Sequence, residues 1–322
     1  MSKSTPRPFE RVQVGVESES DGAPVPAVIW SPTYEVDLGP HVFVTAKYRL
    51  ARERLLADRT LTEGDFVSPT AVTHDELARA HTEQFLTRVE TDSLSAGERM
   101  QLEVPLTEEL REAMAVSCGG TLLTARRALE DGVAVHLGGG FHHAHAGHGE
   151  GFCLYNDVAV AVRVLQAEGA LERSAVIDLD VHQGNGTTAI FADDEDVFTF
   201  SMHQQNNYPE IKPPSDLDIA LEDGTEDDHY LDLLDGALLD VLSEPTPELI
   251  VYLAGADPYE KDQLGGLSLT LEGLRRRDRM VLERAVEHSI PVAVLMAGGY
   301  AHQLADTVSI HVATVEEAVR VG

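Results

Sequence analysis

The chain has 322 residues, of which 43% are apolar, and its 55 acidic side chains outnumber the 24 basic ones to give a formal net charge of −31 at pH 7. A charge of this sign argues against nucleic acid or anionic lipid as a direct ligand. No run approaches the roughly 18 apolar residues that a membrane span needs, the N-terminus has no apolar signal segment, and only two cysteines are present, so we expect a cytoplasmic protein.

Short apolar segments and helical patterns alternate along the chain. The segments expected to be strands are residues 26–30, 133–137, 174–179, 197–202, 249–254 and 291–297. The segments with a helical pattern are residues 107–130, 156–169, 227–243, 270–288 and 302–319. Strands rich in Val, Ile and Leu that alternate with helices indicate a mostly parallel sheet with helices on both faces. We therefore predict a single α/β domain over residues 1–322, with residues 1–25 as an N-terminal extension.

Glycine, histidine and aspartate gather at the ends of five of these strand segments. The stretches that carry them are HLGGGFHHAHAGH (136–148), DLDVHQGNG (178–186), SMHQQNNYPE (201–210), GADPYEKD (255–262) and GGY (298–300). The carboxyl ends of parallel strands lie along one edge of a sheet, and open α/β sheets bind their ligands at that edge. The sequence therefore predicts a catalytic pocket there.

Two aspartates and a histidine form a candidate metal site. Asp180 and His182 are two residues apart, so on an extended backbone their side chains point the same way, and Asp257 at another strand end is the natural third ligand. Three protein ligands leave one position of a tetrahedral ion free for water, as in catalytic zinc sites. These ligands fit Zn²⁺, with Fe²⁺ or Co²⁺ as alternatives. The competing interpretation is that each aspartate only caps a helix or forms a turn.

His142 and His143 follow three glycines, which allow the backbone to turn sharply and to approach a ligand closely. Adjacent imidazoles suit proton transfer, because histidine is the side chain that titrates nearest neutrality. The alternative is that these histidines, together with His145 and His148, form an exposed tract that binds metal adventitiously. For His145 and His148 we favour that alternative.

Five motifs in order, GGGFHHA, GFCLYNDVAVA, DLDVHQGNGT, GADPYEKDQLGGLSLT and AGGY, resemble the zinc-dependent histone deacetylase family. HQGNG and DQLGGLSLT are most similar to the class IV branch of that family and to related bacterial enzymes. The resemblance covers residues 31–314, nearly the whole chain. It implies the arginase-like α/β fold of the family.

The resemblance also implies roles for individual residues. It implies that zinc is bound by Asp180, His182 and Asp257. The residues implied in catalysis are Asp178, which orients His142; His143, the general base and acid; Asn185, behind His143; and Tyr300, whose hydroxyl polarises the scissile carbonyl. Those implied to line a substrate tunnel are Gly151, Phe152, Tyr208 and Leu264. A structural potassium ion is implied near Asp178, Asp180, His182, Ser201 and Met202.

The sequence departs from the family pattern at Asn185, where many members have an aspartate behind the second histidine; the class IV resemblance implies such a change. An amide orients His143 without stabilising its cation as a carboxylate would, so we expect His143 to be mostly neutral near pH 7. Gly184 stands where a binuclear ureohydrolase of the arginase type would carry an aspartate. One catalytic metal ion is therefore expected, not two.

The resulting functional prediction is a zinc-dependent amidohydrolase that removes an acetyl or longer acyl group from the ε-amine of lysine in proteins or peptides. One alternative is a deacetylase of small acetylated amines such as acetylpolyamines, which an acidic surface would favour modestly. Another is a protein that binds acyl-lysine with little catalysis. Neither nucleic acid nor a membrane is expected as a partner. Acyl length, oligomeric state and the origin of the acidity do not follow from the sequence.

Overall fold

The computed structural model describes residues 25–243 and 246–322, and a parallel sheet forms its centre. Its strands are β1 (Ala27–Ile29), β2 (Phe66–Val67), β3 (Val133–His136), β4 (Ser174–Asp178), β5 (Val197–Gln204), β6 (Leu217–Leu221), β7 (Leu249–Leu253) and β8 (Val292–Leu295). Each strand runs parallel to its neighbours. The order across the sheet is β2-β1-β3-β8-β7-β4-β5-β6.

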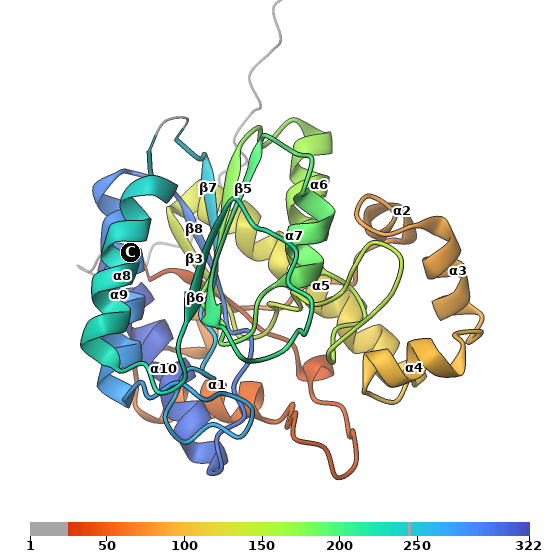
Figure 1. Ribbon diagram of the computed structural model, residues 1–322, viewed down its shortest axis with the longest axis horizontal. Coiled ribbons are helices and arrows are strands. Elements are labelled where there is room, and N and C mark those ends of the chain that lie inside the picture. The colour runs from red at the N-terminus through yellow and green to blue at the C-terminus, as the bar shows by residue number, and fades with distance from the viewer. Residues whose placement is uncertain (1–24, 244–245) are drawn as a thin grey trace, which may run out of the picture.

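Helices cover both faces of the sheet (Figure 1). The α-helices are α1 (Lys47–Ala57), α2 (His74–Leu77), α3 (Glu83–Glu90), α4 (Ala96–Leu102), α5 (Glu108–Asp131), α6 (Asp157–Glu168), α7 (Asn185–Phe191), α8 (Asp227–Val241), α9 (Leu271–Glu287) and α10 (Leu304–Val321), and the 3-10 helices are η1 (Pro32–Tyr34) and η2 (Glu63–Asp65). Helices α1, α8, α9 and α10 form one layer and α5, α6 and α7 the other. The short helices α2, α3 and α4 lie together beyond α5.

Burial and capping account for the main elements. Every residue of β3, β4, β7 and β8 is buried, as expected for strands covered on both faces. The long helix α5 begins at Thr107, whose hydroxyl accepts a hydrogen bond from Leu110 N, and ends at Gly132 with φ 91°. Helix α6 begins at Asn156 and ends at Gly169 in the same manner. The hydrophobic core therefore lies on both sides of the central strands.

The structure confirms the predicted fold class, and the six predicted strands and five predicted helices correspond to observed elements. The sequence prediction missed the two edge strands. β2 has two residues, and β6 is exposed at alternate positions, so neither shows a continuous apolar run. It also missed α1, whose sequence KYRLARERLLA is mostly polar, and the helices α2, α3, α4 and α7, none of which exceeds eight residues.

Two further expectations concern the N-terminal extension and the absence of a membrane span. The predicted N-terminal extension, residues 1–25, lies outside the described residues except for residue 25. Within the described residues, no helix combines the length and apolarity required to cross a membrane.

The order of the strands brings four motif-bearing loops together. The neighbours β3, β8, β7 and β4 occupy the middle of the sheet. Because these strands are parallel, the segments that leave their carboxyl ends emerge at one edge. Those segments carry the histidine pair after β3, Tyr300 after β8, Asp257 after β7, and Asp180 and His182 after β4.

Candidate active site

Asp180, His182 and Asp257 converge at the carboxyl edge of β4 and β7. His182 Nδ1 lies 3.0 Å from Asp180 Oδ1 and 3.7 Å from Asp257 Oδ2. All three side chains are buried, and one ligand atom from each lies within 4.8 Å of the others. The three residues that the sequence assigned to a metal therefore form one cluster, although Asp180 Oδ1 also accepts a local hydrogen bond from His182 N at 3.0 Å.

The chemistry of this cluster fits a cation. Asp257 Oδ2 is buried and has no hydrogen-bond partner, although a buried carboxylate normally requires compensation. A tetrahedral ion with bonds of about 2.1 Å separates its ligands by about 3.4 Å, which is close to the distances between these atoms. Gly298 leaves room beside them, because a Cβ at that position would collide with both carboxylates. The donor set and the orphaned oxygen thus fit a divalent metal ion.

The electrostatics of the cluster point the same way. Burial raises the pKa of Asp257 well above its ordinary value, and the nearby charges of Asp180 and Asp262 add to the rise. Burial also acts against the charge of Asp180, but His142 and His182 outweigh it and hold the pKa of Asp180 low. Two acids that share a dry site repel one another, and a bound cation would relieve that repulsion.

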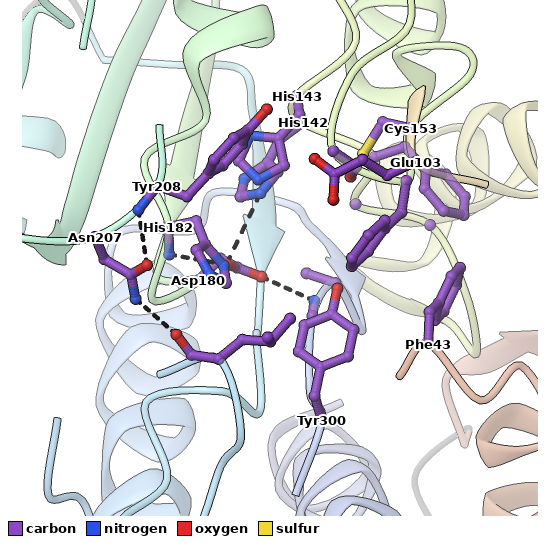
Figure 2. A pocket seen from close by; sticks show the side chains of 18 of the residues that line it. Phe43, Glu103, His142, His143, Cys153, Asp180, His182, Asn207, Tyr208 and Tyr300 are labelled. Carbon is purple, nitrogen blue, oxygen red and sulfur yellow. Dashed lines mark hydrogen bonds and ion pairs between the residues drawn. The ribbon is translucent and has the colours of Figure 1, made fainter. Parts of the chain in front are cut away.

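The histidine pair faces this cluster (Figure 2). His142 Nδ1 lies 2.6 Å from Asp178 Oδ2, and both side chains are buried. Burial disfavours the charged form of His142, but the charges of Asp178 and Asp180 outweigh it and raise the pKa of His142 to about 9. A cation bound at Asp180 would act against this rise. Asp178 therefore orients His142, in the arrangement that the resemblance implied.

His143 is held differently. Its Nδ1 lies 2.7 Å from Asn185 Oδ1, and its ring centroid lies 4.1 Å from that of His142. Burial lowers the pKa of His143 well below its ordinary value, and the charges of His142 and His182 lower it further. The direction agrees with the expectation that His143 is neutral near pH 7, but burial is the leading cause and the amide is not.

Sequence reasoning missed the carboxylate behind this amide. Asn185 Nδ2 donates to Glu150 Oε1 at 2.8 Å, and the Tyr208 hydroxyl donates to the same oxygen at 2.7 Å. The negative charge that the family pattern led us to expect next to the second histidine therefore lies one residue further away. Glu150 immediately precedes the motif GFCLYNDVAVA, and no spacing pattern in the sequence indicates its contact with Asn185.

Asp157, inside that motif, fixes the glycine loop that carries the histidine pair. Its carboxylate accepts hydrogen bonds from Gly140 N at 3.0 Å and Phe141 N at 2.7 Å. Gly140 has φ 83°, and a Cβ there would lie 2.7 Å from the backbone of Ala297. Glycine is required at this position because the loop after β3 passes directly over the loop after β8.

Tyr300 is presented by the loop that follows β8. Asp262 Oδ2 accepts a hydrogen bond from Tyr300 N at 2.6 Å, and Asp262 Oδ1 accepts from Leu264 N at 2.8 Å. Figure 2 shows the hydroxyl directed toward Asp180. Burial raises the pKa of Tyr300 well above its ordinary value, with Asp180 and Asp257 adding to the effect. The hydroxyl therefore keeps its proton and can donate a hydrogen bond.

These residues surround one cavity of about 210 Å³. The four residues assigned to the substrate tunnel all line it: Gly151, Phe152, Tyr208 and Leu264. The Phe152 ring stacks on Phe43 at a centroid distance of 6.2 Å, and the Tyr208 ring meets His143 edge-on at 4.9 Å. Aromatic side chains therefore make up part of the wall, and the polar side chains of His142, His143, Asp180 and His182 line the same cavity.

Three residues of this region carried no signal in the sequence. Phe43 and Glu103 line the cavity from segments without a motif. Lys47 is fully buried behind Tyr300, and its Nζ donates to Ala297 O at 3.1 Å. Burial lowers the pKa of Lys47 to about 8, although Asp257, Asp180 and Asp262 act in the opposite direction. A lysine on a polar helix is expected to be solvated, but Lys47 packs against the rings of Phe43, Tyr48 and Tyr300 and against the loop after β8.

The residues implied to form a potassium site lie at the end of β4 and on the neighbouring strand β5. Asp178 at the end of β4 pairs in register with Ser201 of β5, and Met202 follows Ser201. Asp180 and His182 follow β4 directly. The potassium ion itself stays a prediction.

The buried Arg277 of α9 connects the two loops that carry the metal-ligand candidates. Arg277 Nη1 donates to Leu179 O at 3.3 Å and to Gly255 O at 2.6 Å, and Nε donates to Asp278 Oδ1 at 2.9 Å. Leu179 immediately precedes Asp180, and Gly255 is two residues before Asp257. One guanidinium thus holds both loops from beneath.

The fold and this site place the chain in a known family. The family described as "Histone deacetylase domain" matches residues 41–315. A protein of Picosynechococcus sp. without an assigned function is 39% identical over 88% of this chain and 95% of its own length. Histone deacetylase 2 of Arabidopsis thaliana is 31% identical over 85% of this chain and 74% of its own length. The chain belongs to the histone deacetylase family.

A further relative and two solved structures are also similar to this chain. The acetoin utilization protein AcuC of Bacillus subtilis is 32% identical over 76% of this chain and 69% of its own length. The crystal structure of the HDA15 HD domain superposes with a TM-score of 0.76 at 23% identity, covering 93% of this chain and 89% of that one. An HDAC homolog complexed with SAHA superposes with a TM-score of 0.79 at 22% identity, covering 93% and 85%. At these identities the two structures establish the fold.

Proposed function

We propose that this protein is a metal-dependent amidohydrolase that removes an acyl group from the ε-amine of lysine in proteins or peptides. One observation carries the proposal: Asp180 and His182 line the same cavity as His143 and Tyr300, and Asp257 lies directly beside them, with its Oδ2 3.7 Å from His182 Nδ1. The buried Asp257 oxygen without a partner is what a metal-binding hydrolase needs at this place. The membership in the histone deacetylase family supports the same reaction class.

A divalent ion bound by these three residues would supply Lewis acidity, because it lowers the pKa of bound water toward roughly 7 and polarises an amide carbonyl. We propose Zn²⁺, with Fe²⁺ or Co²⁺ as alternatives, since the ligands are carboxylates and an imidazole without thiolate. Gly184 supports a single catalytic ion. A Cβ at that position would lie 3.2 Å from His142 Nδ1 and closer still to Asp178, so the aspartate of a binuclear site has no room.

His143 is the proposed general base and acid. Asn185 holds its Nδ1, which leaves Nε2 for a proton of the attacking water. The lowered pKa of His143 keeps the ring neutral and able to accept that proton near pH 7. The same nitrogen then returns the proton to the departing amine. Asp178 keeps the neighbouring His142 oriented throughout.

Tyr300 is the proposed donor to the oxygen that gains charge during the attack. Its raised pKa ensures that the hydroxyl is protonated, and its backbone is fixed through Asp262. A donor placed in advance stabilises developing charge without reorganising at the moment of reaction. Tyr300 and His143 thus act on the two ends of the same reacting amide.

The cavity supports an extended N-acyl aminoalkyl substrate. Phe43, Phe152 and Tyr208 supply aromatic walls for a methylene chain. Glu103 is an exposed residue that lines the cavity, and its carboxylate can accept a hydrogen bond from a peptide N–H or an ammonium group. Small acylated amines such as acetylpolyamines share this chemistry and are the second substrate class to test.

The decisive experiment combines a substrate screen with metal analysis on one preparation. Lysine peptides with acyl chains from acetyl upward and a set of acetylpolyamines are assayed before chelation, after chelation and after return of Zn²⁺. We expect turnover of acyl-lysine that chelation abolishes and Zn²⁺ restores. Full activity of the metal-free protein would contradict the proposal, and binding of acyl-lysine without turnover would favour the alternative of a binding protein.

Asp180→Asn is the matched variant for this experiment, because it removes one ligand oxygen charge at nearly constant volume. It should lose activity together with the metal ion that the wild type binds at Asp180, His182 and Asp257. Leu239→Ala serves as the control, since Leu239 is an exposed side chain of α8. Retention of both metal and activity by Asp180→Asn would remove the site from the mechanism.

Three further assignments belong to the same proposal. Asn185 behind His143 supports a class IV-like enzyme. Cys118 and Cys153 are both buried and free, which supports a reducing compartment such as the cytoplasm. A structural K⁺ near Asp178 and Ser201 is proposed from the family resemblance, and replacement of K⁺ by Na⁺ in the assay tests it through activity and thermal stability.

A further inference from the structure

A second cluster of potential metal ligands lies beside the active-site cavity, in the segment of residues 145–150 that we call the histidine loop. We propose that His145, His148 and Glu150 of this loop bind a second divalent transition-metal ion, of the zinc class, and that this ion lowers the activity of the neighbouring site. Binding of the ion does not depend on the proposed function, whereas its effect on turnover rests on it.

The geometry of the cluster fits one ion. Glu150 Oε2 lies 3.2 Å from His148 Nε2 and 3.9 Å from His145 Nε2, and the three ligand atoms all lie within 4.8 Å of one another. A tetrahedral ion with bonds of about 2.1 Å requires a separation of about 3.4 Å. Two imidazoles and a carboxylate with an open position form a known class of zinc site. Small side-chain rotations would complete it.

The histidine loop is not the free, exposed tract that the sequence suggested for His145 and His148. Their rings stack at 4.5 Å with 12° between the planes, so both Nε2 atoms face the same carboxylate. The backbone N–H of His145 donates to His148 O at 3.0 Å, and His81 Nδ1 contacts His145 O at 3.0 Å. The backbone that carries the two histidines is therefore held in place before any ion binds.

An ion can reach the cluster from solvent. His145, His148 and Glu150 line an open hollow of about 640 Å³ next to the active-site cavity. The two hollows share Glu103 and Tyr208 as lining residues. The side chains of His145 and His148 are 22% and 32% exposed, against 9% or less for the ligands of the first cluster. The second ion should therefore exchange more readily than the first.

The cluster connects to the catalytic residues through Asn185 and Glu150. The two oxygens of Glu150 have different partners: Oε2 faces the histidines, and Oε1 accepts from Asn185 Nδ2 and Tyr208 OH. Asn185 Nδ2 also lies 3.2 Å from His145 Nε2. A bound ion would occupy the lone pair of His145 Nε2 and withdraw charge from the Glu150 carboxylate. It would therefore weaken both hydrogen bonds that Asn185 Nδ2 donates, and Asn185 is the residue that holds His143.

Zinc stoichiometry tests the site. The full-length protein is stripped of metal and dialysed to equilibrium against Zn²⁺ over a range of concentrations, and the ions bound per chain are counted. We expect the wild type to bind one ion tightly and a second more weakly. Asp180→Asn should keep only the weaker ion, whereas His145→Ala and His148→Ala should each keep only the tighter one. Loss of a direct ligand should weaken the second site beyond the roughly 10–100-fold that loss of an outer partner causes.

His229→Ala is the matched control, because His229 is an exposed histidine of α8 outside both clusters and should leave both ions in place. Thermal melts confirm that each variant is folded. The second site would be overturned if the wild type bound one ion that Asp180→Asn abolished, or if His148→Ala kept the weaker ion with unchanged affinity. The first site would be overturned if the wild type bound one ion that His148→Ala abolished and Asp180→Asn kept, so the two failures are distinct.

The effect on turnover is tested on the same proteins. Raising Zn²⁺ beyond saturation of the tight site should lower kcat/KM of the wild type and of His229→Ala by roughly tenfold. This is the lower end of the effect on activity that follows when a residue supporting a metal site is disturbed. His148→Ala should resist this inhibition while its activity at low Zn²⁺ stays near that of the wild type. If excess Zn²⁺ inhibited His148→Ala as strongly as the wild type, the effect of the second ion on turnover would be overturned. The number of ions bound per chain would still decide whether the second site exists.

Discussion

At the scale of single residues, the site separates the groups that we propose to react from the groups that hold them in place. His143 and Tyr300 face the cavity, while Asp262 fixes the backbone of Tyr300 and Asn185 fixes the ring of His143. Each holding contact is a short hydrogen bond in a buried place, where loss of a partner leaves an unpaired polar group. Substitutions at the reacting and at the holding residues should therefore have different kinetic signatures.

Replacing Tyr300 by phenylalanine removes the hydroxyl and leaves the ring that packs against Phe43 and Phe152. We expect kcat/KM to fall by on the order of 10²-fold or more, because a prepositioned donor to developing charge is lost. KM should change little. Steady-state kinetics on the best substrate of the screen measure both constants. Near-normal turnover by Tyr300→Phe would remove the hydroxyl from the mechanism.

Asn185→Asp places a carboxylate directly next to His143 Nδ1. The negative charge favours the protonated imidazole, so the pKa of His143 rises from its depressed value. Since the base must be neutral to accept a proton, the acidic limb of the kcat/KM profile should move to higher pH. The profile is measured for the wild type and the variant across the same buffers.

Glu150→Gln combined with Asn185→Asp is the control for this change. In the single variant the introduced carboxylate faces Glu150, and two carboxylates in contact share a proton. The double variant exchanges the positions of amide and carboxylate, so its acidic limb should also lie above that of the wild type. A pH profile of Asn185→Asp that coincides with the wild type would contradict the role assigned to residue 185.

At the scale of elements, the site depends on how α9 is buried under the sheet edge. Arg277 is fully buried and donates to carbonyls of the loops after β4 and β7, which carry Asp180 and Asp257. Asp278, its partner, also accepts from Tyr252 OH at 2.5 Å and from Thr314 Oγ1 at 2.6 Å. One helix therefore sets the separation of two metal-ligand candidates that are far apart in sequence.

Replacing Arg277 by methionine leaves the Asp278 carboxylate buried without its cation. We expect the free energy of unfolding to fall by about 3–5 kcal/mol, as for other broken buried pairs. The affinity for the tightly bound metal should fall as well, because two carbonyls lose their common donor. Urea unfolding and metal titration measure the two effects.

The adjacent Arg276 supplies a matched control for this variant. Its ion pair with Asp228 is at the surface, with side chains 46% and 89% exposed. Exposed pairs of this kind contribute about 0–1 kcal/mol. Arg276→Met should therefore leave both unfolding and metal affinity nearly unchanged. If Arg277→Met were as mild as Arg276→Met, the buried arginine would not hold the two loops.

At the scale of the whole molecule, the excess of acidic side chains acts on anything charged that approaches. The net charge of −31 creates a potential that attracts cations and repels anions. In physiological salt this potential extends over a Debye length of roughly 8–10 Å. Glu103 lines the cavity and adds to this field there. The effect belongs to association and not to the chemical step.

For a cationic substrate, kcat/KM should therefore fall as NaCl rises, while kcat stays nearly constant. An uncharged substrate with the same acyl group should show no such dependence. Initial rates over a salt series with both substrates measure the difference. A parallel decline for the two substrates would indicate a general salt effect on the enzyme and would exclude electrostatic attraction as the cause.

The sequence by itself predicted the parallel α/β fold, because four central strands are continuous apolar runs and their ends carry glycine, histidine and aspartate. It also named the residues that meet at the sheet edge, since local spacing and motif order are properties of the chain. It could not reveal Glu150, Lys47, Asp262 or Arg277. Those side chains act through contacts between segments distant in sequence, and such contacts exist only once the layers are packed. The sequence determines which residue stands at each position. The tertiary structure determines how deeply each side chain is buried and which groups it contacts, and these two properties set its protonation state and its role.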